Sequence, residues 1–105
     1  MKTNPALNPT AFIVLNPVAG LTNAQILQRH IENRFTAFGW NTRFHVTRIE
    51  DSIPPLVKEA LANGVDLVVA VGGDGTIAAV AAGMVHSSIP LGIIPTGTWN
   101  AIARN

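Results

Sequence analysis

Segments with the hydrophobic pattern of a β-strand alternate along the chain with segments that have the pattern of an α-helix. Short apolar runs have the length and composition of buried strands, and one further segment alternates between apolar and polar side chains as an edge strand does. The predicted strands are residues 11–15, 40–48, 65–71 and 89–94, and the predicted helices lie at about 22–38, 52–62 and 76–85. The pattern is therefore β-α-β-α-β-α-β, followed by the start of a further helix at residue 101.

Each predicted helix carries an apolar stripe that should face the sheet, because its apolar residues recur at helical spacing. The stripes are Leu27, Ile31, Phe35 and Phe38 in the first helix, Leu56, Val57, Ala60 and Leu61 in the second, and Ile77, Val80, Ala81, Met84 and Val85 in the third. Gly39 follows the first helix, where a glycine commonly ends one.

Strands that alternate with helices across short loops indicate right-handed crossovers and a parallel sheet. The expected fold is a Rossmann-like three-layer α/β/α domain. Glycine-bearing loops follow the first, third and fourth strands, at residues 16–20, 72–76 and 95–98. If one ligand contacts all three loops, their strands must be neighbours, which predicts the strand order 2-1-3-4. That order also places the alternating segment 40–48 at an edge of the sheet.

The three loops lie together at the carboxyl edge of such a sheet, where ligands bind in open α/β folds. Glycines let backbone N–H groups approach an anion, and the helices that follow would direct their positive ends to the same place. Thr76, Thr96 and Thr98 add hydroxyl groups. A Gly-Gly-Asp-Gly sequence can also be a simple turn, but its position directly after a buried strand favours a phosphate-binding loop.

Asp74 is the only Asp, Glu, Lys or Arg between Leu67 and Ala103. The loop therefore differs from the P-loop, in which a lysine meets the phosphates. Phosphates would here need backbone amides, hydroxyls and Mg²⁺. A carboxylate beside such a site suits a magnesium ligand or a base for an attacking hydroxyl, so we expect Asp74 to be the catalytic and metal-binding residue.

Composition limits the other functions that the chain can have. Its 105 residues suit one domain, with residues 1–10 as a polar tail and 11–105 as the folded unit, and the net charge of +1 comes from scattered basic residues, which argues against nucleic-acid binding. No cysteine and no run of about 20 apolar residues occur, which fits a cytoplasmic protein without a membrane span. A charged fraction of only 12% predicts exposed apolar surface. The apolar strand predicted at residues 89–94 would leave its edge bare, which predicts self-association.

The loops at residues 16–20, 72–76 and 95–100 together resemble the diacylglycerol kinase catalytic-domain family, over residues 11–105. That family contains lipid kinases and is related to NAD kinases. The resemblance implies ATP and Mg²⁺ as cofactors and a lipid hydroxyl as the phosphate acceptor. The residues it implies for nucleotide binding are Asn16, Thr47, Gly72, Gly73, Asp74, Gly75, Thr76, Gly97, Thr98 and Asn100, with Asp74 in the phosphate, metal or base chemistry.

Two departures from the family pattern bear on activity. Ala78 and Ala79 stand where the family commonly has Asn-Glu, and Ala101 stands where an aspartate often follows the loop asparagine. Family members are also about three times as long and carry a β-rich C-terminal domain with further catalytic carboxylates. We therefore expect this chain to be the nucleotide-binding part of a longer enzyme, inactive alone, with the lipid held by the missing domain and possible peripheral membrane contact.

Two other functions stay open on the sequence. The first alternative is that the chain is part of an NAD kinase, since the Gly-Gly-Asp-Gly core does not distinguish lipid kinases from NAD kinases. It is alternatively a non-catalytic nucleotide-binding module, which Ala78 and Ala79 favour.

Overall fold

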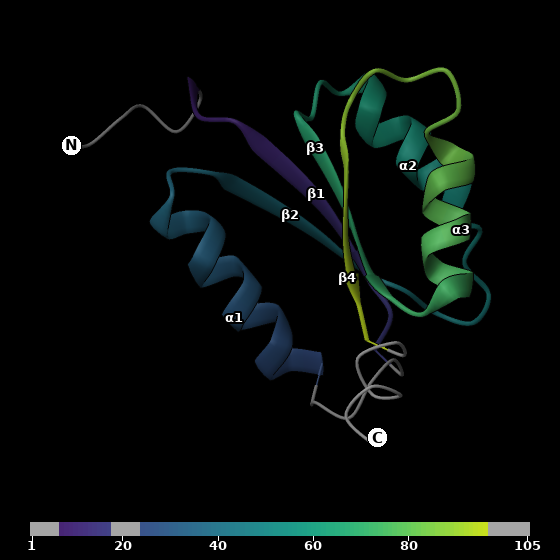
Figure 1. Cartoon of the computed structure of the whole chain (residues 1–105), viewed down its shortest axis with the longest axis horizontal. Helices are drawn as coiled ribbons and strands as arrows, with labels where there is room; N and C mark the ends of the chain where they lie inside the picture. The colour runs from purple at the N-terminus through teal and green to yellow at the C-terminus, as the bar shows by residue number, and fades with distance from the viewer. Residues whose placement is uncertain (1–6, 18–23, 97–105) are drawn as a thin grey trace.

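A computed structural model of the chain describes residues 7–17 and 24–96. Strands and helices alternate through these residues as the hydrophobic pattern predicts (Figure 1). They are β1 (Thr10–Leu15), α1 (Ala24–Ala37), β2 (Asn41–Val46), α2 (Ile53–Ala62), β3 (Leu67–Gly72), α3 (Asp74–Gly83) and β4 (Leu91–Pro95). The further helix expected from residue 101 lies outside the described residues.

The described strands form one four-stranded parallel sheet in the order β2-β1-β3-β4, which confirms the predicted topology. Leu15 at the end of β1 is in register with Val46 of β2 and with Val71 of β3. The carboxyl ends of the three strands therefore finish side by side. The partly polar strand β2 lies at one edge, as its alternation predicts.

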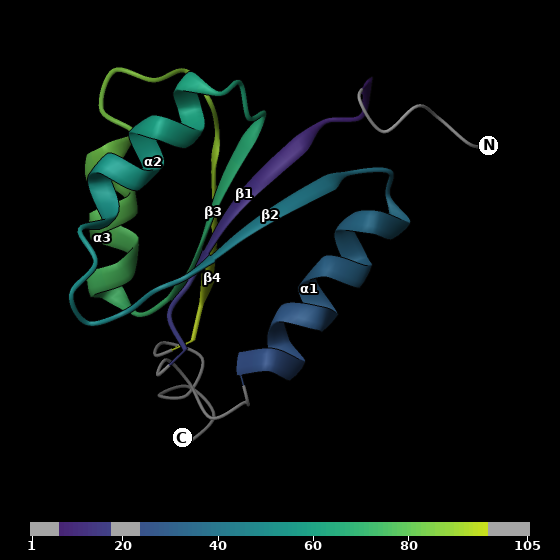
Figure 2. The ribbon, with the colours of Figure 1, turned by 180° about the vertical axis from the view of Figure 1, so that it is seen from behind.

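Helices cover both faces of the sheet and make three layers, with α1 on one side and α2 and α3 on the other (Figures 1 and 2). β1 and β3 are buried on both faces, which explains why their sequences are continuously apolar. The core on the α2–α3 side contains Phe12, Val14, Val57, Ala60, Val65, Val68, Ala70, Val80 and Met84. The core on the α1 side contains Ala11, Ile13, Leu15, Ile31, Val69 and Val71.

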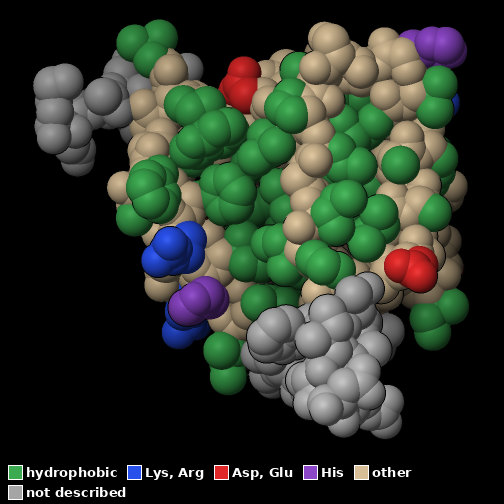
Figure 3. All heavy atoms as spheres, viewed as in Figure 1, with side chains coloured by type: hydrophobic (Ala, Val, Ile, Leu, Met, Phe, Trp, Pro, Cys, Tyr) green, Lys and Arg blue, Asp and Glu red, His purple; other side chains and the backbone are tan. Residues whose placement is uncertain are grey.

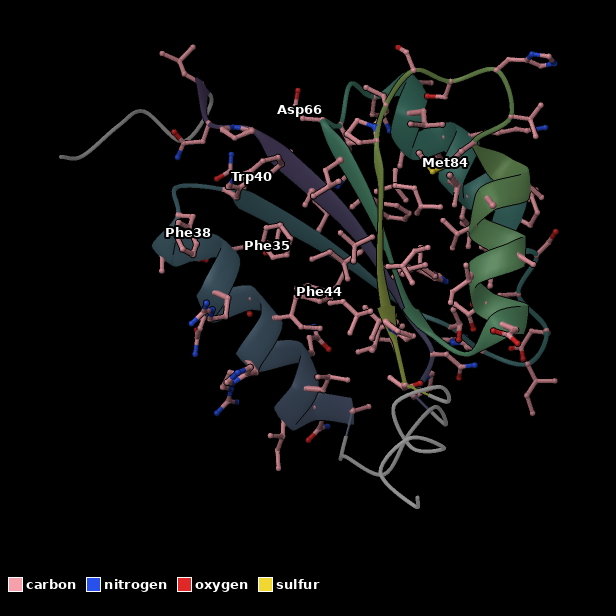
Figure 4. All side chains as sticks on the ribbon, viewed as in Figure 1. Phe35, Phe38, Trp40, Phe44, Asp66 and Met84 are labelled. Carbon is pink, nitrogen blue, oxygen red and sulfur yellow. The ribbon has the colours of Figure 1, made fainter. Side chains whose placement is uncertain are left out.

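Aromatic residues extend the core on the α1 side toward the β2 edge. Phe35 of α1 meets Trp40 edge to face with ring centroids 5.9 Å apart, and Phe44 of β2 packs against the same cluster (Figure 4). Phe38 is different, because its side chain is 74% exposed, so its predicted place in the α1 stripe is wrong. α1 ends at Ala37, and Gly39 turns the chain with a φ of +83°, so that Phe38 lies beyond the last helical turn.

The third helix also differs from its prediction. It begins at Asp74, two positions earlier than expected, and it ends at Gly83. Its buried face consists of Thr76, Val80 and Gly83, whereas Ala81 and Val85 are exposed. Ile77, Val80 and Met84 of the predicted stripe do pack in the core on the α2–α3 side, and Val85 lies beyond the end of the helix. The early start places Asp74, Gly75 and Thr76 in the first helical turn.

No helix within the described ranges has the length and apolar character needed to cross a bilayer. Hydrophobic side chains nevertheless gather on the face of the molecule on which β4 lies (Figure 3). β4 forms the second edge of the sheet, and Ile93 at its centre is 49% exposed. This edge is apolar, in contrast to the β2 edge, where Arg43 is exposed.

Candidate functional site at the carboxyl edge of the sheet

The segments that follow the four strands are tied to one another by backbone hydrogen bonds. Thr47 N donates to Leu15 O over 2.9 Å, and Asn16 N donates to Val71 O over 3.0 Å. Thr96 N donates to Gly72 O over 3.1 Å. The sheet ladder therefore continues past the strand ends and fixes the starts of the loops beside one another, at the lower end of the sheet in Figure 1.

The N-terminus of α3 opens at this edge. Gly73 is the N-cap residue, and because it has no side chain it caps none of the first helical amides. Asp74 follows in the first turn with an exposed side chain. The first amide groups of a helix have no acceptor within the helix, and the helix dipole makes this end partly positive. An anion placed here would meet backbone donors, and Asp74 brings a carboxylate to the same position.

The glycines of this turn have two different roles. A methyl group on Gly72 would lie 2.8 Å from Thr76 Oγ1 and 2.9 Å from Thr76 Cβ, so Gly72 allows the helix to approach the end of β3 closely. A methyl group on Gly73 or Gly75 would meet no atom of residues 7–17 and 24–96 within 4 Å. Relative to that part of the chain, the backbone at those two positions faces open space, as a surface that receives a ligand must.

Thr76 connects the first turn of α3 to the loop that follows β1. Its side chain is buried, with 7% relative exposure, and its Oγ1 accepts a hydrogen bond from Asn16 Nδ2 over 3.2 Å. Asn16 and Thr76, which are both predicted to bind nucleotide, are therefore in direct contact. Because Oγ1 accepts this bond, its own proton is left to donate to another group.

The sequence predicts that Thr96 adds a hydroxyl group to this edge, but Thr96 is not one of the residues predicted to bind nucleotide. Among the side chains of residues 7–17 and 24–96, its Oγ1 is the buried polar atom without a hydrogen-bond partner. A buried unpaired hydroxyl costs about 1–3 kcal/mol and calls for an explanation, of which a functional contact is one. The signal in the sequence was its position directly after β4.

The structure therefore brings together the predicted residues Asn16, Thr47 and 72–76, and it adds Thr96. Gly97, Thr98 and Asn100, the other predicted residues, lie outside the described part of the chain. No group of three or more His, Cys, Asp and Glu side chains that could hold a metal ion occurs within the described part.

Glycine-bearing loops at the carboxyl edge of a parallel sheet place this chain among the open α/β folds, which bind their ligands at that edge. The comparison with known proteins makes the class specific, since the profile of the diacylglycerol kinase catalytic domain matches residues 10–105. The chain belongs to the diacylglycerol kinase catalytic domain family.

Related proteins are named as diacylglycerol kinases or lipid kinases. The chain is 35% identical to a diacylglycerol kinase of Bacillus subtilis over 90% of its own length and 32% of that protein. It is 45% identical to a probable lipid kinase YegS-like of Xanthomonas campestris over 55% of its length and 21% of that protein. A diacylglycerol kinase crystal structure from Bacillus anthracis superposes on 92% of the chain with a TM-score of 0.68 and 31% identity, and the match covers 34% of that structure. The chain thus spans about a third or less of the length of these relatives.

Proposed function

We propose that this chain is the ATP-binding part of a lipid kinase that transfers the γ-phosphate of ATP to a lipid hydroxyl, of the diacylglycerol or sphingoid type. The observation that carries the proposal is the open glycine backbone at the N-terminus of α3, beside an exposed Asp74 and next to the ends of all the strands. Family membership supports the same reaction class, because the relatives described above are named as diacylglycerol or lipid kinases.

The residues present fit the phosphates of a nucleotide. Gly73 and Gly75 leave space for an oxyanion to approach the backbone, and helix N-termini of this kind bind phosphate through their amides. The buried Thr96 Oγ1 lacks a partner among the described residues, and a phosphate oxygen would supply one. Thr47 and Asn16 border the same edge and would hold other parts of the nucleotide.

Mg²⁺ also fits this site. Mg²⁺ is commonly held by one or two carboxylates together with waters and substrate phosphates, so a single carboxylate such as Asp74 is sufficient on the protein side. Bound Mg²⁺ would neutralise charge on the phosphates. Asp74 would either coordinate it or accept the proton that the lipid hydroxyl loses when its oxygen bonds to the γ-phosphorus and ADP leaves.

The lipid acceptor is favoured over NAD as the substrate because the relatives named above are lipid kinases rather than NAD kinases. The chain covers only about a third of those proteins, and the groups that recognise the lipid would come from the remainder of the kinase.

Nucleotide binding can be measured on the chain itself. We expect ¹⁵N-labelled chain titrated with Mg·ATP to show its largest amide shift changes at residues 72–76, at Thr47 and at Thr96, with smaller changes when Mg²⁺ is withheld. The complete kinase should phosphorylate diacylglycerol or a sphingoid base in mixed micelles and should form no NADP from NAD. Shifts confined to residues far from the strand ends, or NADP formation, would contradict the proposal.

A further inference from the structure

A carboxylate closes the turn between β2 and α2. Asp51 Oδ2 accepts a hydrogen bond from Arg48 N over 2.8 Å and lies 2.8 Å from His45 Nε2, and Asp51 N donates to Arg48 O over 3.1 Å. One side chain is thus joined both to the last part of β2 and to the backbone three residues before it. We call this arrangement of His45, Arg48 and Asp51 the Asp51 clasp.

The clasp encloses Thr47, one of the residues of the proposed nucleotide site. Thr47 lies between His45 and Arg48, which both bind the Asp51 carboxylate, and its own backbone N–H is fastened to Leu15 O. The backbone is therefore held on both sides of Thr47 and at Thr47 itself. A residue fixed in this way loses little further freedom when a ligand binds, and this lowers the entropic cost of binding.

Apart from the backbone hydrogen bond from Asp51 N to Arg48 O, the Asp51 carboxylate makes the contacts that hold this turn. Ile49 is fully exposed at 104% relative exposure, and Arg48 and Glu50 are exposed as well, so apolar burial does not hold the segment. Asp51 does not serve as the N-cap of α2 either, because that position belongs to Ser52. The Asp51 carboxylate thus acts on the turn that precedes it, on the side of Thr47.

We propose that Asp51 and His45 are positioning residues that hold Thr47 at the carboxyl edge of the sheet for contact with the nucleotide. This inference rests on the proposed nucleotide-binding function and extends it to two residues that do not touch the ligand. Asp51 acts through Thr47, so its effect on nucleotide affinity depends on the Thr47 side chain.

The test is a double-mutant cycle on Mg·ATP affinity, measured by calorimetry with the whole chain. Asp51→Ala should weaken binding roughly threefold to tenfold, as expected when one side-chain-sized ordering cost is added to binding. In a Thr47→Val background the same change should have little further effect, because residues that act as a unit are not additive. His45→Ala should weaken binding in the same direction, and His45→Gln should restore part of it by donating from its amide.

Asp66 provides a matched control. Its Oδ2 also accepts a backbone hydrogen bond, from Thr10 N over 2.9 Å, but at the opposite end of the sheet (Figure 4). Asp66→Ala should leave Mg·ATP affinity unchanged. An equal loss of affinity in Asp66→Ala and Asp51→Ala would identify a general loss of stability and overturn the inference.

A measurement without ligand separates the remaining outcomes. In the nucleotide-free chain, Asp51→Ala should speed hydrogen exchange at the Thr47 and Arg48 amides and leave exchange at Val80 in α3 unchanged. Unchanged exchange at Thr47, or wild-type affinity in Asp51→Ala, would reject the positioning role while leaving the proposed function intact. A wild-type chain that binds no Mg·ATP would reject the proposed function and this inference with it.

Discussion

Asn16 and Thr76, separated by 60 positions in the chain, are joined by a hydrogen bond from Asn16 Nδ2 to Thr76 Oγ1 over 3.2 Å. The bond links the loop after β1 to the first turn of α3, and Thr76 is buried. A hydrogen bond of this kind contributes about 0.5–1.5 kcal/mol. Asn16→Ala and Thr76→Val should therefore each lower the free energy of unfolding, and the double variant should lose less than the sum. Urea denaturation of the four chains measures this coupling, and strict additivity would show that the bond contributes nothing.

Asp74→Asn separates catalysis from folding. Asparagine keeps the size and turn preference of aspartate but removes the charge that a magnesium ligand or a base requires. In the complete kinase we expect kcat to fall by at least about 10²-fold, the lower end of general-base contributions. The melting temperature of the ligand-free chain should hardly change, because Asp74 is exposed in the first turn of α3. Normal turnover of the Asp74→Asn kinase would show that residues 72–76 have only a structural role.

Thr96→Val should move stability and binding in opposite directions. The variant removes a buried hydroxyl that has no partner among the described residues and keeps nearly the same shape. The ligand-free chain should be as stable as the wild type or more stable, by up to about 1 kcal/mol, since an unpaired polar group is costly to bury. Mg·ATP affinity should fall, and Thr96→Ser should retain it. A destabilised Thr96→Val chain with normal affinity would contradict a ligand contact at this position.

Acid should open the Asp51 clasp only at low pH. The hydrogen bond from Arg48 N, and after it that from His45, hold the pKa of Asp51 below its usual range. A carboxyl group whose pKa is lowered on folding stabilises the protein above its unfolded pKa and loses that contribution as pH falls through the folded one. The melting temperature of the wild type should therefore exceed that of Asp51→Asn at neutral pH. The two should converge in acid, and a difference that persists at the lowest pH would show that charge is not the cause.

The β4 edge should cause self-association of the chain. Val68 N donates to Pro90 O and Thr96 N donates to Gly72 O, so the backbone groups of the alternate residue Ile93 face away from β3. An apolar edge strand with such groups invites pairing with another chain. We expect sedimentation at millimolar concentration to show dimers or larger assemblies, and Ile93→Lys to favour the monomer with little change in melting temperature. A monomeric wild type under these conditions would contradict the prediction.

The order of the elements and the topology of the sheet followed from the sequence. Apolar runs and helical periodicity are local properties, and β1 and β3 carry them strongly because both of their faces are buried. The strand order was inferred from the expectation that the three glycine loops contact one ligand, because such loops require neighbouring strands. The ends of the helices were harder to predict, because a turn residue such as Gly73 can begin a helix or precede it. α3 begins at Asp74 and ends at Gly83, which leaves Val85 outside the helix and exposed.

The sequence by itself determined which residues have the chemistry for a phosphate site: the glycines, the threonines and the single carboxylate Asp74. Only the tertiary structure decided which of these residues serve packing and which are open to a ligand. Gly72 lies against Thr76 and serves packing, whereas Gly73 and Gly75 open outward, and Asp51 turns back toward His45 instead of capping α2. These outcomes depend on strand register and on the approach of a helix to the sheet. Such distances join residues far apart in the chain, and no local pattern encodes them.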